Sequence, residues 1–445
     1  MRTGAKISTV TSTALLTDRY ELTMLDAALL DGTASRRSVF EVFARRLPLE
    51  RRYGVVAGTG RLLSLIGDFR FGDAELSWLA DHDVVRPATI DWLASFRFNG
   101  TINGYREGEI YFPGSPLLSV EGTFAEAVLL ETLVLSVLNY DSAVATAASR
   151  MVQAAHGRPL AEMGSRRASE DAAVAATRAA YIAGFATSSN LEAGRKWGIP
   201  TMGTAAHAFT LLHDSEEEAF RAQVAALGVG TTLLVDTYDV HTAIETAVRV
   251  AGPRLGAVRL DSGDLPKLVR SVRAQLDALG AVNTKITVTN DLDEFAIAAL
   301  TGSPVDSFGV GTSVVTGSGA SAAGMVYKLV AREGASGEWV GVAKKSTGKA
   351  SVAGRKAGIR RLEGGVATAE VVDVASGDGE DARGAAQGGR LLTVPLLVDG
   401  EPWAEFTGAV GTVAAREHHA AVIEELPEDA FRLGRGEPAL PTVFV

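Results

Sequence analysis

Aspartates and arginines gather in short polar clusters, each of which directly follows an apolar stretch of the chain. The members are Asp236, Asp239, Asp261, Asp264, Asp291 and Asp293, together with Arg166, Arg167 and Arg259. Magnesium binds through a few carboxylates and substrate phosphate oxygens, and arginine binds phosphate or carboxylate at two points. The set therefore favours a magnesium-bridged phosphate ligand, whereas any single aspartate at a strand end can equally be a helix N-cap.

A glycine-containing string, Gly309-Val310-Gly311-Thr312, closes another apolar stretch and opens the next element. The backbone N–H groups of such a turn can cradle a phosphate. The string lacks the full dinucleotide-binding fingerprint and the lysine of a P-loop. A plain tight turn is therefore the alternative interpretation.

His207 follows the apolar segment GIPTM, which we interpret as a strand, so we expect its imidazole to face the site as a titrating or nucleophilic group. A structural histidine is the alternative. The other histidines have no such setting and show no two-histidine metal spacing, which argues against a stable zinc site. Tyr20 stands beside Asp18 and Arg19 and can stack on a planar ligand; a core tyrosine at a helix start is the alternative.

Composition limits the classes of protein that these clusters can serve. The 445 residues are 47% hydrophobic and 22% charged, which is typical of a folded chain of two to three domains. A net charge of −10 excludes general attraction to nucleic acid or an anionic membrane. The absence of cysteine excludes disulfides, thiolate nucleophiles and cysteine-bound metals. With no secretory or membrane-spanning segment in view, we expect a soluble, cytoplasmic protein.

The elements that must position these residues fall into three segments. Residues 22–30 have helical spacing, residues 39–43 alternate like a strand, and residues 101–120 resemble antiparallel strands. This pattern predicts an N-terminal α+β domain over residues 1–140. The apolar run 124–150 predicts one or two mostly buried helices.

Between residues 160 and 330 the pattern changes to short strands that each end in a polar cluster and lead into a helix. This order predicts a parallel sheet, open or closed into a barrel, with ligands at the carboxyl ends of its strands. We expect the catalytic α/β domain over residues 141–330. Residues 331–445 then form a C-terminal segment that returns to the α+β domain, with a flexible glycine-rich loop over 375–390. The basic run 344–349 can hold polyphosphate or be a solvated loop.

Taken in order, the clusters match a set of motifs that is specific in combination. They are TDRYELTM at 17–24, FEVFARRLP at 40–48, GSRRASEDAA at 164–173, GTAAHAF at 203–209, VDTYD at 235–239, RLDSGDL at 259–265, TNDLDE at 289–294 and FGVGT at 308–312. From about residue 14 to about residue 365 the chain resembles the nicotinate phosphoribosyltransferase family.

This resemblance implies an irregular α/β barrel beside an α+β domain built from both chain ends, and a homodimer whose partner subunit completes each site. It implies that nicotinate and phosphoribosyl pyrophosphate give nicotinate mononucleotide and pyrophosphate in NAD salvage, with Mg²⁺ as cofactor and ATP as a coupled co-substrate in a ligase-class reaction. Coupling in the family uses a phosphorylated histidine, and His207 has that position in the motif.

The resemblance also implies roles for individual residues. Asp261 and Asp264 belong to the ribose or magnesium region, Gly309, Gly311 and Thr312 to the 5′-phosphate, Arg166 to a substrate carboxylate or phosphate, Tyr20 to the pyridine ring, and Thr204 and Arg259 to further substrate contacts. Arg45 or Arg46 is expected to reach the pyrophosphate site of the partner subunit. These roles fit the chemistry, because displacing pyrophosphate from the anomeric carbon builds positive charge on the ribose and negative charge on the leaving group.

Asn190 bears on substrate choice. Nicotinamide-using relatives have an aspartate at this position, which would accept from an amide but repel a carboxylate. Asn190 removes that repulsion and favours nicotinate. The family usually has a hydroxyl residue after the motif histidine, where this chain has Ala208. The alternatives are the same fold acting on nicotinamide or quinolinate, and a non-enzymatic nucleotide-binding or scaffolding protein.

Overall fold

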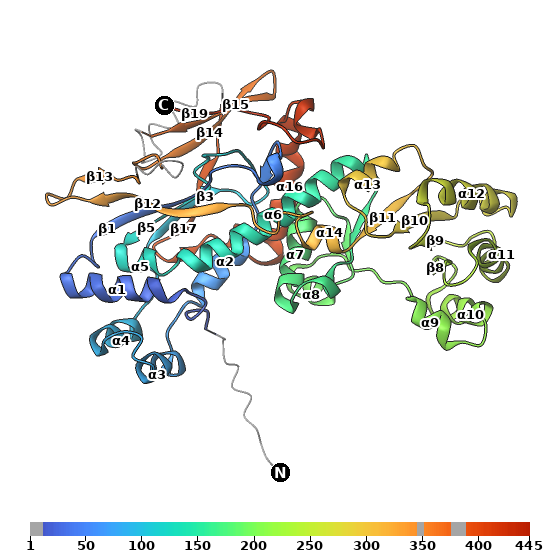
Figure 1. Ribbon diagram of the computed structural model, residues 1–445, viewed down its shortest axis with the longest axis horizontal. Helices are drawn as coiled ribbons and strands as arrows, with labels where there is room; N and C mark the ends of the chain where they lie inside the picture. The colour runs from blue at the N-terminus through green and yellow to red at the C-terminus, as the bar shows by residue number, and fades with distance from the viewer. Residues whose placement is uncertain (1–11, 345–350, 375–388) are drawn as a thin grey trace, which may run out of the picture. The chain divides into compact units, whose positions relative to one another are not determined.

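The computed structural model describes residues 12–344, 351–374 and 389–445. It divides into two compact units, of which the first combines Met1–Ser142 with Ala322–Val445 and the second is Ala143–Ser321 (Figure 1). The basic run at 345–349 and most of the glycine-rich segment, residues 375–388, lie outside the described residues, so the interpretations given to them stay predictions.

Strands from both chain ends interleave in the main sheet of the first unit. Its order is β13 (Trp339–Gly341), β12 (Met325–Glu333), β1 (Arg37–Ala44), β5 (Leu118–Thr123), β3 (Thr101–Tyr105), β17 (Thr393–Val398) and β18 (Glu401–Pro402). All of these pairings are antiparallel, and Figure 1 shows orange β12 lying beside blue β1. The expected α+β domain built from both chain ends is therefore confirmed.

Helices and smaller sheets complete the first unit. The helices are α1 (Arg19–Asp31), α2 (Thr59–Gly67), α3 (Asp73–Asp81), α4 (Pro87–Ala94), α5 (Phe124–Val128) and α16 (Gly408–Val422), with short 3-10 turns at Pro48–Glu50, Ala404–Phe406, Ile423–Glu425 and Glu428–Phe431. The remaining strands are β2 (Gly54–Val55) with β4 (Ile110–Tyr111), and β16 (Gly389–Leu391), β14 (Ala357–Glu363), β15 (Val366–Asp373) and β19 (Thr442–Phe444). Apolar side chains of the sheet and of α1, α2 and α5 form one core, exemplified by Leu25, Phe40 and Val128.

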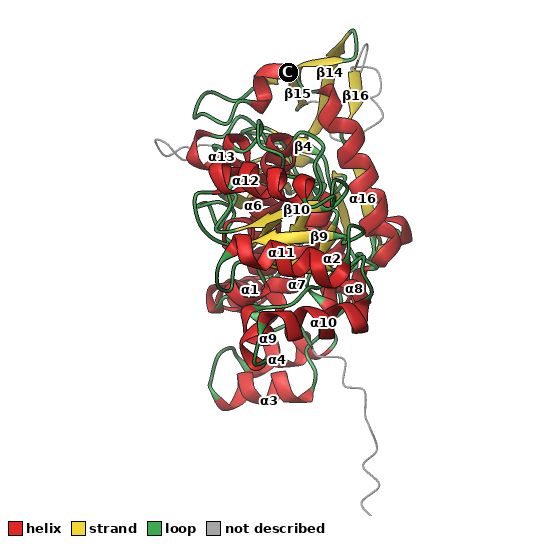
Figure 2. Ribbon diagram, turned by 90° about the vertical axis from the view of Figure 1, so that its right-hand side faces the viewer, coloured by secondary structure: helices red, strands yellow, loops and turns green. Residues whose placement is uncertain are grey.

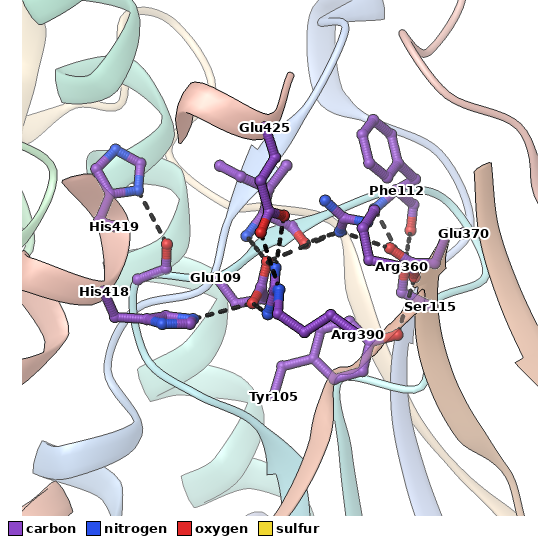
Figure 3. A network of polar contacts seen from close by, with 12 residues as sticks. Tyr105, Glu109, Phe112, Ser115, Arg360, Glu370, Arg390, His418, His419 and Glu425 are labelled. Carbon is purple, nitrogen blue, oxygen red and sulfur yellow. Dashed lines mark hydrogen bonds and ion pairs between the residues drawn. The ribbon is translucent and has the colours of Figure 1, made fainter. Parts of the chain in front are cut away.

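A buried polar network joins the C-terminal segment to the N-terminal strands of this unit (Figure 3). Glu109 accepts hydrogen bonds from Arg390 Nη1 at 2.6 Å and pairs with His418 Nε2 at 2.9 Å. Arg360 Nη2 donates to Glu370 at 3.0 Å, and Tyr105 donates to the same carboxylate at 2.9 Å. Burial would raise the pKa of Glu109, but hydrogen bonds from His418 and Arg390 lower it to about 2. Buried charges are tolerated when they are paired in this way.

The second unit is built on a parallel sheet, as the alternation of strands and helices predicts. Its order is β7 (Thr187–Ser188), β6 (Leu160–Glu162), β11 (Ser307–Val310), β10 (Lys285–Thr289), β9 (Ala257–Leu260) and β8 (Thr232–Leu234). The sheet forms half of a barrel. The segment GIPTM, interpreted as a strand in the sequence, makes only a single bridge from Thr201 to Ser188.

Helices follow the strands of the second unit. They are α7 (Glu170–Ile182), α8 (Leu191–Trp197), α9 (His207–Leu212), α10 (Glu216–Leu227), α11 (Val240–Ala251), α12 (Leu265–Ala278), α13 (Glu294–Ala299) and α14 (Thr312–Val315), with a 3-10 turn at Ser165–Arg167. Figure 2 shows α11 and α12 beside β9 and β10. The long helix α6 (Glu131–Ala155) begins in the first unit and ends in the second. In the described part of the chain, no helix combines the length and apolar character required to span a bilayer.

Candidate active site

The polar clusters of the second unit lie at one edge of its parallel sheet. In the spatial order of the strands, the clusters supply Asn190 after β7, Arg166 after β6, Gly311 after β11, Asp291 after β10, Asp261 after β9 and Asp236 after β8. Because the carboxyl ends of parallel strands meet at the same edge, the sheet brings these loops together. Tyr20 belongs to the first unit, as do Arg45 and Arg46, which we expect to act at the site of the partner subunit.

Hydrogen bonds lock the loops after β8, β9 and β10 to one another. The buried Asp236 accepts from the Asp261 backbone N–H at 2.8 Å and from the Ser262 hydroxyl at 2.7 Å. Asp261 Oδ1 in turn accepts from the Thr289 hydroxyl at 2.5 Å. The second oxygen of Asp236, Oδ1, is buried and has no hydrogen-bond partner in the described part of the chain. One carboxylate oxygen of each aspartate is thus fixed in structure, and the other is available for further chemistry.

His207 begins α9 and directs its ring at these two carboxylates. Its Nδ1 lies 3.1 Å from the Thr237 hydroxyl, and its Nε2 lies 4.0 Å from Asp236 Oδ1 and 3.9 Å from Asp261 Oδ2. The side chain is 41% exposed, so an incoming ligand can reach the ring. At these separations the carboxylates make no hydrogen bond to the imidazole.

Arg259 brings a guanidinium to the same place. Its Nη1 donates to the Thr204 hydroxyl at 2.6 Å, and its Nε is buried without a partner in the described part of the chain. Burial lowers the pKa of Arg259 from its usual value, the charges of Asp261 and Asp236 oppose this shift, and Arg166 adds to it. The Thr204 contact also connects the loop that precedes His207 to β9.

Asn190 has a structural role in addition to the role in substrate choice that we expect for it. Its Oδ1 accepts from the Ala193 N–H at 2.9 Å and caps α8, while its Nδ2 donates to the Ser165 hydroxyl at 3.0 Å. Ser165 belongs to the turn that carries the exposed Arg166. The side-chain amide of Asn190 therefore connects the loop after β7 with the loop after β6.

The two glycines of the FGVGT motif differ in their surroundings. A Cβ on Gly309 would lie 2.5 Å from Thr289 Cγ2 and 2.7 Å from Met163 Sδ, so close packing between strands requires glycine there. Gly311 precedes α14, and a Cβ on it would meet only ordinary contacts. Thr312, the first residue of α14, is exposed. Only Gly311 and Thr312 therefore lie at the open edge.

The alternative interpretation of the aspartates as helix caps holds for two of them. Asp239 accepts from the Thr242 N–H at 2.9 Å and caps α11, and Asp293 accepts from the Ala296 N–H at 2.8 Å and caps α13. Asp264 lies exposed at the N-cap position of α12 without a side-chain cap bond. Asp291 lies at φ 26° in the same edge. The carboxylates nearest to His207 are therefore those of Asp236 and Asp261.

Tyr20 in α1 presents a partly exposed ring, with 46% of the residue accessible. Its hydroxyl hydrogen-bonds Glu131, and the pKa of Tyr20 is raised to about 12 by partial burial and by the nearby charges of Glu131, Glu21 and Asp18. The phenol therefore stays neutral, and the ring face is free to stack on a planar ligand.

Sequence reasoning missed several residues that hold this edge together. They are Thr237, Thr289, Ser165 and Glu162, all of which stand in or beside the strand-end clusters. Glu162 could have been found, because it is the one acid in the short apolar strand LAE and is therefore a buried carboxylate. The three hydroxyl residues carry no comparable signal, since serine and threonine are common in any loop.

Comparison with known proteins gives consistent results. The family model for the N-terminal domain of nicotinate phosphoribosyltransferase matches residues 15–139. A nicotinate phosphoribosyltransferase of Mycobacterium tuberculosis is 58% identical over 437 residues, covering 96% of this chain and 94% of the relative. One of Bacillus subtilis is 38% identical over 356 residues, covering 78% and 72%.

Solved structures agree with the sequence relatives. The crystal structure of human nicotinic acid phosphoribosyltransferase is similar with a TM-score of 0.81 at 26% identity, covering 97% of each chain. A nicotinate-nucleotide pyrophosphorylase from Pyrococcus furiosus is similar with a TM-score of 0.76 at 25% identity, covering 97% of this chain and all of the other.

Proposed function

The chain belongs to the nicotinate phosphoribosyltransferase family, and we propose that it converts nicotinate and phosphoribosyl pyrophosphate to nicotinate mononucleotide and pyrophosphate in NAD salvage. The observation that carries the proposal is the edge of the parallel sheet, where His207, Asp261 and Arg259 meet within a few hydrogen bonds of one another. A carboxylate, an imidazole and a guanidinium in one place are the groups that this transfer requires.

The reaction places opposite charges on the two halves of phosphoribosyl pyrophosphate. Positive charge develops at the anomeric carbon, which a carboxylate such as that of Asp261 stabilises. Negative charge develops on the departing pyrophosphate and remains on the 5′-phosphate, and arginines bind such groups at two points. We assign Arg259 to these anions, the backbone at Gly311 and Thr312 to the 5′-phosphate, and Arg166 to a phosphate or to the carboxylate of the pyridine substrate.

Magnesium fits this edge as a cofactor shared with the substrate. No group of three or more histidine, cysteine, aspartate or glutamate side chains in the described residues could hold a metal alone. Magnesium does not require such a group, because it takes one or two carboxylates and completes its shell with phosphate oxygens and water. The buried, unpartnered Oδ1 of Asp236 supports a cation nearby. Asp261 and Asp264 are the proposed ligands, and the ion would neutralise the departing pyrophosphate.

ATP coupling through His207 is the second part of the proposal. Because Nδ1 faces Thr237, Nε2 is the nitrogen free to attack the γ-phosphorus of ATP. A nitrogen–phosphorus bond forms, the bond to the β–γ bridging oxygen breaks, and ADP leaves. Water later hydrolyses the phosphohistidine to phosphate. The exposed ring and its position beside Asp261 support this assignment.

The remaining parts of the proposal concern partners and place. Tyr20 would stack on the pyridine ring, within a homodimer in which the partner subunit completes each site. The net charge of −10 supports small-molecule partners without nucleic acid or membrane, and a cytoplasmic location agrees with the need for ATP.

A product assay tests the function. The purified protein receives phosphoribosyl pyrophosphate and Mg²⁺ with nicotinate, nicotinamide or quinolinate, each with and without ATP. We expect nicotinate mononucleotide from nicotinate, formed faster with ATP. Product from nicotinamide alone would identify nicotinamide as the substrate instead of nicotinate. ATP-independent product with release of CO₂ from quinolinate would identify quinolinate as the substrate. No product from any of the three pyridines would contradict the proposed enzyme.

A further inference from the structure

A buried carboxylate organises the turn that carries Arg166. Glu162 ends β6 and is 1% exposed. It accepts hydrogen bonds from the Gly164 N–H, from the Thr177 hydroxyl at 2.7 Å and from the Ser188 hydroxyl at 2.6 Å. Each of these bonds comes from a neutral group, although a buried carboxylate is costly to keep without a cation. Such an arrangement indicates that the role of the carboxylate is to hold the three donor groups, and with them the turn, in place.

Asn190 continues this network to the other side of the turn. Its backbone N–H donates to the Ser188 hydroxyl at 2.9 Å, and its Nδ2 donates to the Ser165 hydroxyl at 3.0 Å. A chain of contacts therefore runs from Glu162 through Ser188 and Asn190 back to Ser165. It fixes residues 164–167 at two points.

The backbone of the turn has no room to move toward the neighbouring strand. A Cβ on Gly164 would overlap Val315 Cγ1 and lie 2.8 Å from the Gly311 carbonyl oxygen. The Met163 N–H also donates to the Val310 carbonyl at 2.8 Å. The turn is thus held against the loop of the FGVGT motif, the proposed site of the 5′-phosphate.

In contrast, the side chain of Arg166 is uncommitted. It is exposed and makes no hydrogen bond or ion pair within the described part of the chain, yet its charge acts on the half-buried Arg259. A fixed backbone with an exposed guanidinium is suited to binding an anion, because little further ordering of the turn is needed on binding.

We propose that Glu162, Asn190 and Ser165 are positioning residues that hold the turn 164–167 so that Arg166 binds the carboxylate of the pyridine substrate. This proposal rests on the proposed function. It also adds to the interpretation of Asn190. The residue then affects substrate choice in two ways: it positions Arg166, and its neutral side chain does not repel the substrate carboxylate.

The two mechanisms of Asn190 can be separated by substitution. Ser165→Ala removes the acceptor of the Nδ2 hydrogen bond without changing any charge. Asn190→Asp keeps the Oδ1 acceptor that caps α8 but loses the donor to Ser165 and adds a negative charge. Ser169→Ala is the matched control, since Ser169 precedes α7 and its side chain makes no cap hydrogen bond.

Steady-state kinetics give the first readout. We expect Ser165→Ala to raise KM for nicotinate about tenfold with a smaller change in kcat, because misplacing one positioning group weakens binding before chemistry. Ser169→Ala should leave both unchanged. In an Arg166→Ala background, Ser165→Ala should raise KM for nicotinate by less than a further twofold. The proposal would be overturned if Ser165→Ala raised KM as much in the Arg166→Ala background as in the wild type. It would also be overturned if Ser165→Ala kept the wild-type KM while Asn190→Asp was inactive.

A readout that needs no activity separates failure of this proposal from failure of the proposed function. Hydrogen exchange of the wild-type protein should show protection of the Gly164 amide, and Ser165→Ala and Glu162→Gln should both accelerate its exchange. If the wild-type protein makes no product, the function is wrong, while exchange still reports on the turn. Unchanged exchange in both variants would overturn the positioning role even in an active enzyme.

Discussion

Nε2 of His207 lies 3.9 Å from Oδ2 of Asp261, and the other oxygen of Asp261 accepts a hydrogen bond from Thr289. One carboxylate therefore connects the histidine with the ends of β9 and β10. A phosphoryl group on Nε2 would be close to the carboxylate that we assign to the ribose or its metal ion. The coupling step and the transfer step would then share the same charges, so each can influence the other by direct electrostatic interaction.

His207→Ala is expected to retain phosphoribosyl transfer and to lose both ATP stimulation and covalent phosphate, because the variant lacks the proposed phosphate carrier. Incubation with ATP labelled at the γ-phosphate, followed by a test for base-stable, acid-labile protein phosphate, measures the loss. His213→Ala is the matched control, since His213 directly follows the same helix and its Nδ1 lies 2.8 Å from the Phe209 carbonyl oxygen. Unchanged ATP stimulation in His207→Ala would refute the assignment.

Asp261→Asn should lower kcat by on the order of 100-fold, because the amide keeps the shape and the Thr289 contact but removes the negative charge that we assign to stabilising the ribose. Initial rates at saturating substrate measure the effect. Asp239→Asn provides the comparison, since Asp239 caps α11 and asparagine caps as well as aspartate does. We expect its rate to stay within about twofold of the wild type. Equal rates for the two variants would contradict the role of Asp261.

The position of each aspartate relative to its strand explains why the sequence predicted the site edge but not every role in it. Asp261 follows directly after β9 and faces His207, whereas Asp239 directly precedes α11 and caps it. Both stand in similar polar strings, VDTYD and RLDSGD, and the boundaries of strand and helix decide between the two roles. Those boundaries depend on tertiary packing, which a sequence pattern locates only to within a few residues.

Contacts between distant residues account for the rest of what the sequence did not predict. Glu109 and Arg390 form a buried ion pair although 281 positions separate them, and Thr204 meets Arg259 across 55 positions. Hydrophobic periodicity shows which face of an element is apolar. It therefore predicted α1, β1, the helices α5 and α6 and the parallel sheet. It contains no information on which polar side chains meet across those elements.

Gly309→Ala is expected to lower the free energy of unfolding by about 1–3 kcal/mol, because its new methyl group would overlap Thr289 and Met163. Gly302→Ala adds the same methyl group where no atom lies within 4 Å, and it should be neutral. Urea unfolding of the two variants at one pH measures the difference. Equal stability of both variants would show that Gly309 is not required by packing, and a loss of activity alone would then favour a direct role at the phosphate.

Acidification is expected to destabilise the first unit through His419, which is buried with Nδ1 2.9 Å from the Gly108 carbonyl oxygen. Burial lowers the pKa of His419 to about 4, against an ordinary value of 6.5, and the Gly108 bond opposes this shift only in part. The unfolded chain therefore binds a proton below pH 6.5 that the folded chain does not bind until about pH 4. The free energy of unfolding should fall over that interval by about 3 kcal/mol and stay constant above it.

His419→Asn removes this titration while keeping a donor for Gly108, so its stability should depend less on pH between about 6.5 and 4.5 than that of the wild type. Glu109 acts in a separate pH interval. Its pKa is about 2 in the folded protein and 4.5 ordinarily, so the stability that its charge contributes is lost only as the pH falls below 4.5. His82→Asn, at an exposed position after α3, should keep the wild-type dependence. Denaturant unfolding at pH 7 and pH 5 distinguishes the variants, and an identical pH dependence in all of them would contradict the role of His419.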